Sequence, residues 1–118
     1  MNEVIKCLVE RRSCKKYLPR QVDEAALQEV LLAGTYAPSG KNRQAAKILV
    51  VQKPEDVAAL QRLNAAVLGN PEGKPFYGAP TVLVVLADAE VNTAVEDGSV
   101  VMENLMIAAH SLGLGSCW

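Results

Sequence analysis

The sequence predicts a single domain in which helices pack against a small sheet. Two short apolar runs, Ile48–Val51 and Thr81–Ala87, have the length and β-branched content of buried strands. Apolar residues at helical spacing precede, separate and follow these runs, so the expected order is helix, helix, strand, helix, strand, helix. Because a sheet and an amphipathic helix each bury one face, this order predicts a layered α/β architecture over residues 1–118.

Each expected helix carries a recognisable start or stop. Asn2 and Asp23 are predicted N-caps, and Pro54 is predicted to open the third helix. The fourth and longest helix runs from about 92 to 112 and ends at Gly113, because glycine accepts a left-handed cap. The side chains expected on the inner faces of the first three helices are Val4, Ile5, Leu8, Val9, Leu27, Val30, Leu31, Gly34, Val57, Leu60, Leu63 and Val67.

Two segments are predicted to be covered on more than one side. The run Thr81–Ala87 lacks alternation, which indicates a strand with both faces buried. The second half of the last helix is apolar around most of its circumference, which is typical of a buried helix. One small subunit covers only one side of such a helix, so we expect an obligate homodimer with Leu105 at the interface. The alternative is a helix enclosed within one subunit.

Composition argues against several classes of function. The net charge of −1 gives no basic excess for nucleic acid, and no apolar run is long enough to span a membrane. Cys7, Cys14 and Cys117 show no CxxC spacing, so neither a zinc site nor a disulfide framework is expected, and the cytoplasm is the expected compartment. The acidic residues between 88 and 97 lack metal-ligand spacing, so no metal is expected.

Two polar clusters are the strongest candidates for a binding site. In the first, residues 9–17 read VERRSCKKY. Pro19 disfavours a helical conformation just before it, so the segment from Ser13 onward is predicted to be extended. Arg11, Ser13 and Lys15 then point to the same side, because side chains alternate along a strand. Two cations and a hydroxyl in a row are hydrogen-bond donors suited to a phosphate. The alternative is a solvated basic turn between two helices.

The second cluster reads APSGKNRQ at residues 37–44 and follows the first at a spacing that one helix fills. Its Pro38-Ser39-Gly40 sequence predicts a loop. Asn42 and Gln44 carry amides, which donate and accept hydrogen bonds and therefore suit the mixed edge of a heterocycle. The alternative is a turn whose polar side chains only satisfy backbone groups.

Other polar residues give weaker signals. His110, the single histidine, fits a cation at a helix C-terminus or a satisfied core residue better than a base. Cys14 lies among cations that favour a thiolate, but an unreactive, half-exposed cysteine is the preferred interpretation. Asn64 and Asn70 fit loop or cap positions better than ligand contacts.

Four segments in order, ERRSCKKY, APSGKNRQ, YGAPTVLVVLAD and EDGSVVMENLMIAAHSLGLGSCW, resemble the nitroreductase family of FMN-dependent enzymes. The resemblance covers nearly the whole chain. It implies an α+β, three-layer fold with a central mixed sheet flanked by helices, assembled as an intertwined homodimer with one FMN in each of two interface sites. Because the family's chain continues past this point, we expect a C-terminally incomplete domain; the alternative is a natural terminus packed by Trp118.

The resemblance also implies roles for individual residues. The first segment would meet the ribityl phosphate and the pyrimidine edge of FMN, and the second would add flavin contacts, in part from the partner subunit. Ala45 and Ala46 replace a Pro-Trp pair that is common in the family, which predicts a more open site. The implied FMN-binding residues are Arg11, Arg12, Ser13, Lys15, Pro38, Ser39, Gly40, Asn42 and Gln44.

The implied chemistry is hydride transfer from NAD(P)H through FMN to nitroaromatics, quinones or similar acceptors by a ping-pong scheme. No side chain is expected to act as a nucleophile. Lys15 is the candidate for stabilising negative charge on the reduced flavin. Two alternatives stay open: a flavin-fold relative with other chemistry, such as an enone reductase or a flavin-consuming enzyme, and a non-catalytic dimerising fragment.

Overall fold

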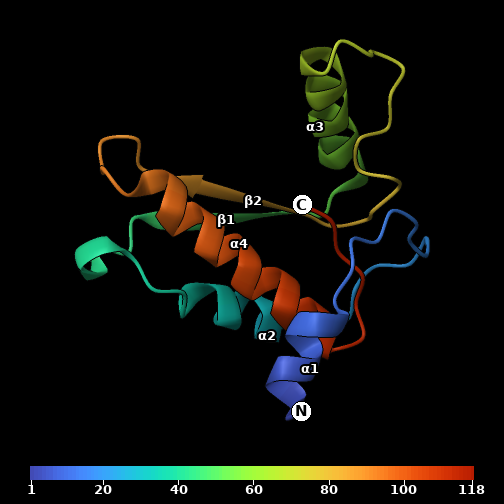
Figure 1. Cartoon of the computed structure of the whole chain (residues 1–118). Coiled ribbons are helices and arrows are strands. Elements are labelled where there is room, and N and C mark those ends of the chain that lie inside the picture. The colour runs from blue at the N-terminus through green and yellow to red at the C-terminus, as the bar shows by residue number, and fades with distance from the viewer.

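Helix α4 lies at the centre of the fold, with α2 along one side and the sheet along another (Figure 1). The computed structural model describes residues 1–118 and contains the main elements in the order that the sequence predicts, which confirms the α+β class. No helix is both long and apolar enough to cross a bilayer. The elements are α1 (Glu3–Glu10), α2 (Glu24–Thr35), the short 3-10 helix η1 (Gly40–Asn42), β1 (Ala46–Val51), α3 (Pro54–Val67), β2 (Val82–Ala87) and α4 (Ala94–Ser111).

The predicted helix signals act as expected. The Asn2 side chain accepts a hydrogen bond from the backbone of Ile5 at 2.9 Å, and Asp23 accepts one from Ala26 at 3.3 Å. Gly113 ends α4 with a φ of +76°, a left-handed conformation that glycine adopts without strain. Local sequence therefore determines where these three helix ends lie.

The core forms where α2, α4 and β1 meet. A Cβ added at Gly34 would lie 2.6 Å from Leu105 Cδ2 and 2.8 Å from Ile48 Cδ1, so α2 approaches its neighbours more closely than a side chain there would allow. Close packing of this kind makes a core sensitive to added volume. The buried centre of the core consists of Val30, Val101, Leu105 and Ala109.

The sheet is covered on one face only. Strands β1 and β2 pair antiparallel, and Ile48 and Val85 pack against the core. Leu49 and Leu86 lie on the opposite face and are about half exposed. The prediction that both faces of Thr81–Ala87 are covered is therefore wrong within this chain. An unbroken apolar run predicts apolar surroundings, but it does not identify the chain that provides them.

Three further sequence predictions are wrong within this chain. The side chains expected on the inner face of α1 are all exposed, at 44% to 66%: Val4, Ile5, Leu8 and Val9. Leu63 and Val67 were expected on the inner face of α3, yet they are 65% and 88% exposed. Helix α3 projects beyond the end of the sheet, so its apolar stripe has little to pack against (Figure 1). Leu105 was expected at a dimer interface, but it is 3% exposed in the core of its own chain, in contact distance of the Gly34 position. Periodicity locates an apolar stripe without identifying its partner.

Candidate functional site

The basic cluster, residues 11–15, leaves α1 in the extended conformation that the sequence predicts. Ser13 forms a parallel bridge with Ser116, and the backbone N–H of Cys14 donates to the Ser116 carbonyl at 2.8 Å. Strand alternation then places Ser13 and Lys15 on the same side, and both side chains are exposed. The bridge therefore anchors the cluster to the segment that follows α4.

The cations of the basic cluster have different surroundings. Arg12 Nη1 donates to the carbonyls of Val9 at 2.7 Å and Arg11 at 2.8 Å, so this guanidinium closes the C-terminal end of α1. The Lys15 ammonium lies 5.7 Å from the centre of the Tyr77 ring, a cation–π distance. Arg11 is half-buried. The Lys15 ammonium is thus exposed beside an aromatic ring, whereas Arg12 is held by backbone groups.

Tyr17 contacts the backbone of the basic cluster. Its hydroxyl donates to the Cys14 carbonyl. Burial raises the pKa of Tyr17 to about 12, and negative charge on Cys14, Cys117 and Tyr77 adds to the shift. The Cys14 thiol donates to the carbonyl of Lys16 at 3.1 Å.

The second cluster forms a compact loop, residues 38–44, which we call the amide loop. Lys41, Asn42 and Gln44 have φ values of +53°, +53° and +54°, a left-handed region that costs energy for residues other than glycine. Gln44 Nε2 donates to Asn42 Oδ1 at 2.9 Å, and the Gln44 backbone N–H donates to Ser39 Oγ at 3.0 Å. The two amides that the sequence singles out therefore lie side by side, both exposed, while Pro38 is exposed beside them.

Two hydrogen bonds attach the amide loop to the start of α4. The Gly40 N–H donates to Asp97 Oδ1 at 2.9 Å, and Arg43 Nη1 donates to Asn92 Oδ1 at 3.1 Å. The spacing of the acidic residues argues against Asp97 as a metal ligand, and its role in holding the loop was not predicted. A signal was present, because Asp97 lies four residues before Val101 on the apolar stripe of the helix, where a carboxylate needs partners.

The two clusters do not meet within one chain. The amide loop is attached at the N-terminal end of α4, whereas the basic cluster pairs with Ser116, beyond the C-terminal end (Figure 1). Helix α4 has 18 residues and is about 27 Å long. A ligand that touches both clusters through one chain would have to span this helix.

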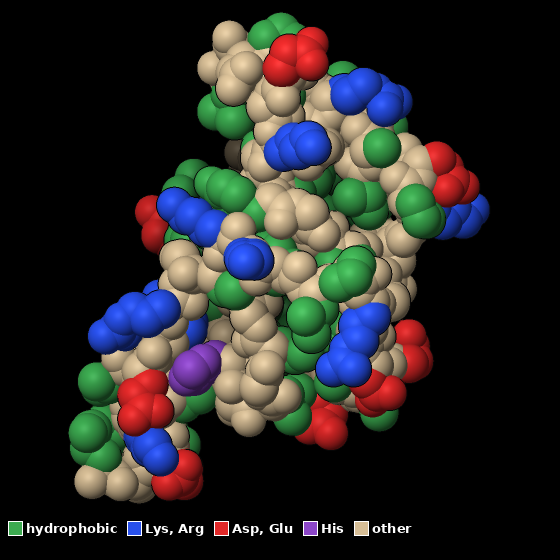
Figure 2. Space-filling view, turned by 90° about the vertical axis from the view of Figure 1, so that its right-hand side faces the viewer, with side chains coloured by type: hydrophobic (Ala, Val, Ile, Leu, Met, Phe, Trp, Pro, Cys, Tyr) green, Lys and Arg blue, Asp and Glu red, His purple; other side chains and the backbone are tan.

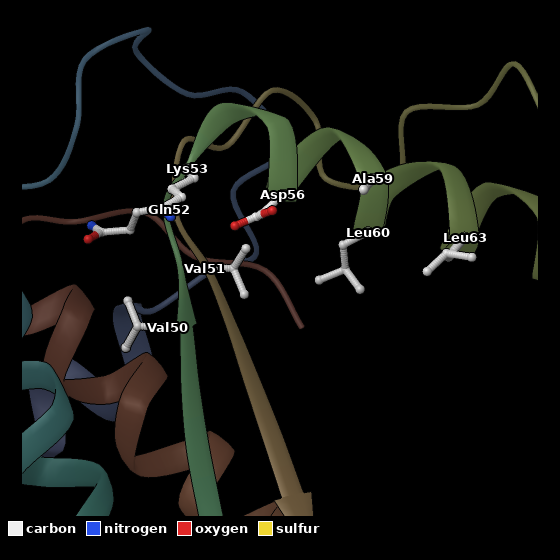
Figure 3. Close-up of a pocket in the computed structure, with 8 residues that line it drawn as sticks. All are labelled: Val50, Val51, Gln52, Lys53, Asp56, Ala59, Leu60 and Leu63. Atoms are coloured by element: carbon white, nitrogen blue, oxygen red, sulfur yellow. The ribbon is translucent and has the colours of Figure 1, made fainter.

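Other candidate features lie outside the two clusters. An open cavity of about 500 Å³ lies between the end of β1 and α3, where Val51 and Leu60 flank Asp56 (Figure 3). Its lining is mostly apolar. On the face shown in Figure 2, Lys and Arg side chains are interspersed with hydrophobic ones rather than gathered in one patch. His110 lies in the last turn of α4, and Asn64 and Asn70 are exposed in and after α3.

Comparison with known proteins identifies the family. The model of the nitroreductase family matches residues 8–76 and 69–118. The chain belongs to the nitroreductase family. A protein of Archaeoglobus fulgidus with the provisional name NADH dehydrogenase/NAD(P)H nitroreductase is 32% identical to this nitroreductase, over 100% of the chain and 67% of the relative.

Two further relatives support the same family assignment. A protein of Methanothermobacter thermautotrophicus with the same provisional name is 29% identical over 98% of this chain and 60% of its own length. The crystal structure of a nitroreductase from Bacteroides fragilis with bound FMN has a TM-score of 0.90 and 28% identity, and the match covers 100% of this chain and 70% of that one. The nitroreductase described here thus spans 60% to 67% of the length of the two curated relatives.

Proposed function

We propose that this nitroreductase binds FMN and passes hydride from NAD(P)H through the flavin to a small-molecule acceptor. The observation that carries the proposal is that the chain has both an exposed phosphate-type donor set, Ser13 and Lys15, and a preformed loop that presents the amides of Asn42 and Gln44. The FMN bound to the Bacteroides fragilis relative supports the same assignment. Nitroaromatics and quinones are the acceptor classes to test first.

The residues fit the chemical groups of FMN. Ser13 and Lys15 would hold the phosphate and the anionic edge of the flavin, because both are donors on one side of an extended segment. Arg11 would add charge, and Arg12 would act mainly by fixing the end of α1. When bound, FMN supplies the hydride-transfer chemistry, and the protein supplies position and electrostatics. Lys15 would also stabilise negative charge on the reduced cofactor.

The amide loop would supply the remaining contacts. Asn42 and Gln44 would meet the heterocycle edge with mixed donors and acceptors, while Pro38, Ser39 and Gly40 would shape the backbone that presents them. Because this loop and the basic cluster lie at opposite ends of α4, we propose that each FMN site combines the basic cluster of one subunit with the amide loop of its partner. The assembly would then be a homodimer with two sites.

The visible spectrum of the purified protein tests the proposal. We expect a yellow protein, or one that becomes yellow when it is incubated with FMN and passed through a desalting column. NAD(P)H added without oxygen should then bleach the flavin band, and a quinone should restore it. A protein that stays colourless after incubation contradicts the proposal. The cytoplasm remains our proposed compartment, on the basis of three free cysteines.

A further inference from the structure

Asp97 is a carboxylate almost completely removed from water. It is 4% exposed and lies on the side of α4 that faces the core. Its Oδ1 accepts the Gly40 N–H at 2.9 Å, and its Oδ2 accepts the Thr93 hydroxyl at 2.9 Å. A buried carboxylate costs free energy unless it is hydrogen-bonded, so both partners are needed to keep Asp97 in this place.

The contact between the amide loop and α4 is close as well as polar. A Cβ added at Gly40 would lie 2.4 Å from Thr93 Oγ1 and 2.9 Å from Thr93 Cγ2. Only glycine lets the loop backbone come near enough for its N–H to reach the carboxylate. The sequence places Gly40, Thr93 and Asp97 in two distant segments, and the fold joins them into one junction.

The backbone of the amide loop needs contacts with the rest of the fold to keep its conformation. Lys41, Asn42 and Gln44 all adopt left-handed backbone conformations, and strained conformations persist only where surrounding contacts hold them. The hydrogen bonds inside the loop join its own residues, so they do not fix its direction relative to the fold. The bond from Gly40 to Asp97 and the bond from Arg43 to Asn92 do so, and Asp97 is the buried member.

The geometry points to Asp97 as a positioning residue: its buried carboxylate holds Gly40 and thereby sets the direction in which the amide loop presents Asn42 and Gln44. Asp97 acts through the loop and does not itself touch a ligand. The consequence for cofactor affinity rests on the proposed FMN site, whereas the consequence for loop conformation does not. A general effect of negative charge at the start of α4 is the competing explanation, and the adjacent, exposed Glu96 offers that charge without the contact.

Limited trypsin digestion without FMN measures how readily the amide loop opens. Lys41 and Arg43 are exposed, so cleavage after them reports opening of the amide loop, and cleavage after the exposed Arg20 serves as an internal reference. Loss of a hydrogen bond to a charged group shifts the equilibrium between the closed and the open loop by about 10- to 150-fold. We expect Asp97→Ala to accelerate cleavage after Lys41 and Arg43 by that factor relative to Arg20, and Glu96→Gln to leave it unchanged.

Two conservative variants keep the test decisive if Asp97→Ala fails to fold. Asp97→Asn retains an oxygen that accepts the Gly40 N–H, so it should restore nearly wild-type cleavage. Thr93→Val removes the hydroxyl that orients the carboxylate and should accelerate cleavage after Lys41 and Arg43. Unchanged cleavage in Thr93→Val and Asp97→Ala, or equal acceleration in Glu96→Gln, overturns the proposal.

A second measurement connects the loop to the cofactor. FMN titrations followed by flavin fluorescence should give a dissociation constant that rises about 10- to 150-fold in Asp97→Ala and stays near wild type in Asp97→Asn and Glu96→Gln. If the wild type binds no FMN, the proposed function fails while the digestion still judges the positioning role. If the loop opens in Asp97→Ala and the FMN affinity is unchanged, the positioning role for the cofactor is overturned.

Discussion

At the scale of single residues, Lys15 is the most informative side chain of the proposed site. It is exposed, it lies over the ring of Tyr77, and strand alternation sets its direction. Lys16 is also an exposed lysine, but strand alternation is expected to place it on the opposite side of the same segment. The pair therefore separates a directed contact from a general effect of positive charge.

We expect Lys15→Ala to weaken FMN binding about 10- to 150-fold, because it removes a charge-assisted hydrogen bond of roughly 1.5–3 kcal/mol. Lys16→Ala is the matched control and should change the affinity little. Titration of each apoprotein with FMN gives both dissociation constants. Equal losses in the two variants would show that the segment is not extended in the way described.

Tyr17 gives a prediction that needs no cofactor. Its pKa of about 12 in the folded protein exceeds the ordinary value of 10.0, chiefly because of burial. The folded state therefore holds this proton more tightly than the unfolded state, so the contribution to stability is present below about pH 10 and is lost as the pH rises to 12.

Ultraviolet absorption near the phenolate band should show one tyrosine that ionises near pH 12. Tyr17→Phe should remove that step, whereas Tyr36→Phe, at an exposed position, should leave it in place. A step that persists in Tyr17→Phe would assign the raised pKa to another tyrosine.

At the scale of elements, the packing of α2 on α4 depends on Gly34. Its missing side chain lets α2 approach Leu105 and Ile48, and the α4 glycine, Gly98, offers a matched comparison. A Cβ at Gly98 would lie 3.6 Å from the Cβ of Ala87, which is ordinary contact. Two helical glycines thus serve different purposes, and the sequence alone does not separate them.

We expect Gly34→Ala to lower the free energy of unfolding by about 1–3 kcal/mol, because the added methyl group overpacks the core. Gly98→Ala should be neutral or stabilising by up to about 1 kcal/mol, since alanine is the better helix former. Urea denaturation followed by circular dichroism measures both. A Gly34→Ala protein as stable as the wild type would mean that α2 and α4 can move apart without cost.

At the scale of the whole molecule, the arrangement of α4 determines the assembly that the proposed site requires. The helix separates the basic cluster from the amide loop, and apolar side chains such as Leu49 and Leu86 remain uncovered on the sheet. A second copy of the chain would cover apolar surface and bring a second set of clusters. Light scattering should therefore give twice the chain mass of 12.6 kDa.

Mixed dimers test the shared site most directly. A Lys15→Ala chain and an Asn42→Ala chain each carry one damaged cluster. If every site combines clusters from two subunits, random mixing places one intact site in each mixed dimer, so about one site in four regains tight FMN binding. If each site comes from one chain, mixing regains none. Each variant alone, refolded by the same procedure, is the control.

Much of the fold could be predicted from local patterns. The strands near 48 and 82, the caps at Asn2 and Asp23, and the end of α4 at Gly113 all depend on residues close together in the chain. The extended course of the basic cluster and the loop character of residues 38–44 were predicted for the same reason. Local backbone preferences and apolar spacing act over a few residues, so they can be recognised in the sequence alone.

The sequence by itself thus determined the positions of the helices and strands, because these follow from short-range periodicity and capping, and it located the two polar clusters by their residue types; the α+β class came from the resemblance to the family. Only the tertiary structure decided that Asp97 meets Gly40, that Leu105 belongs to the core of its own chain, and that the clusters lie at opposite ends of α4. These facts depend on how distant segments pack. The hydrophobic effect is non-directional, so a hydrophobic stripe does not specify which surface will cover it.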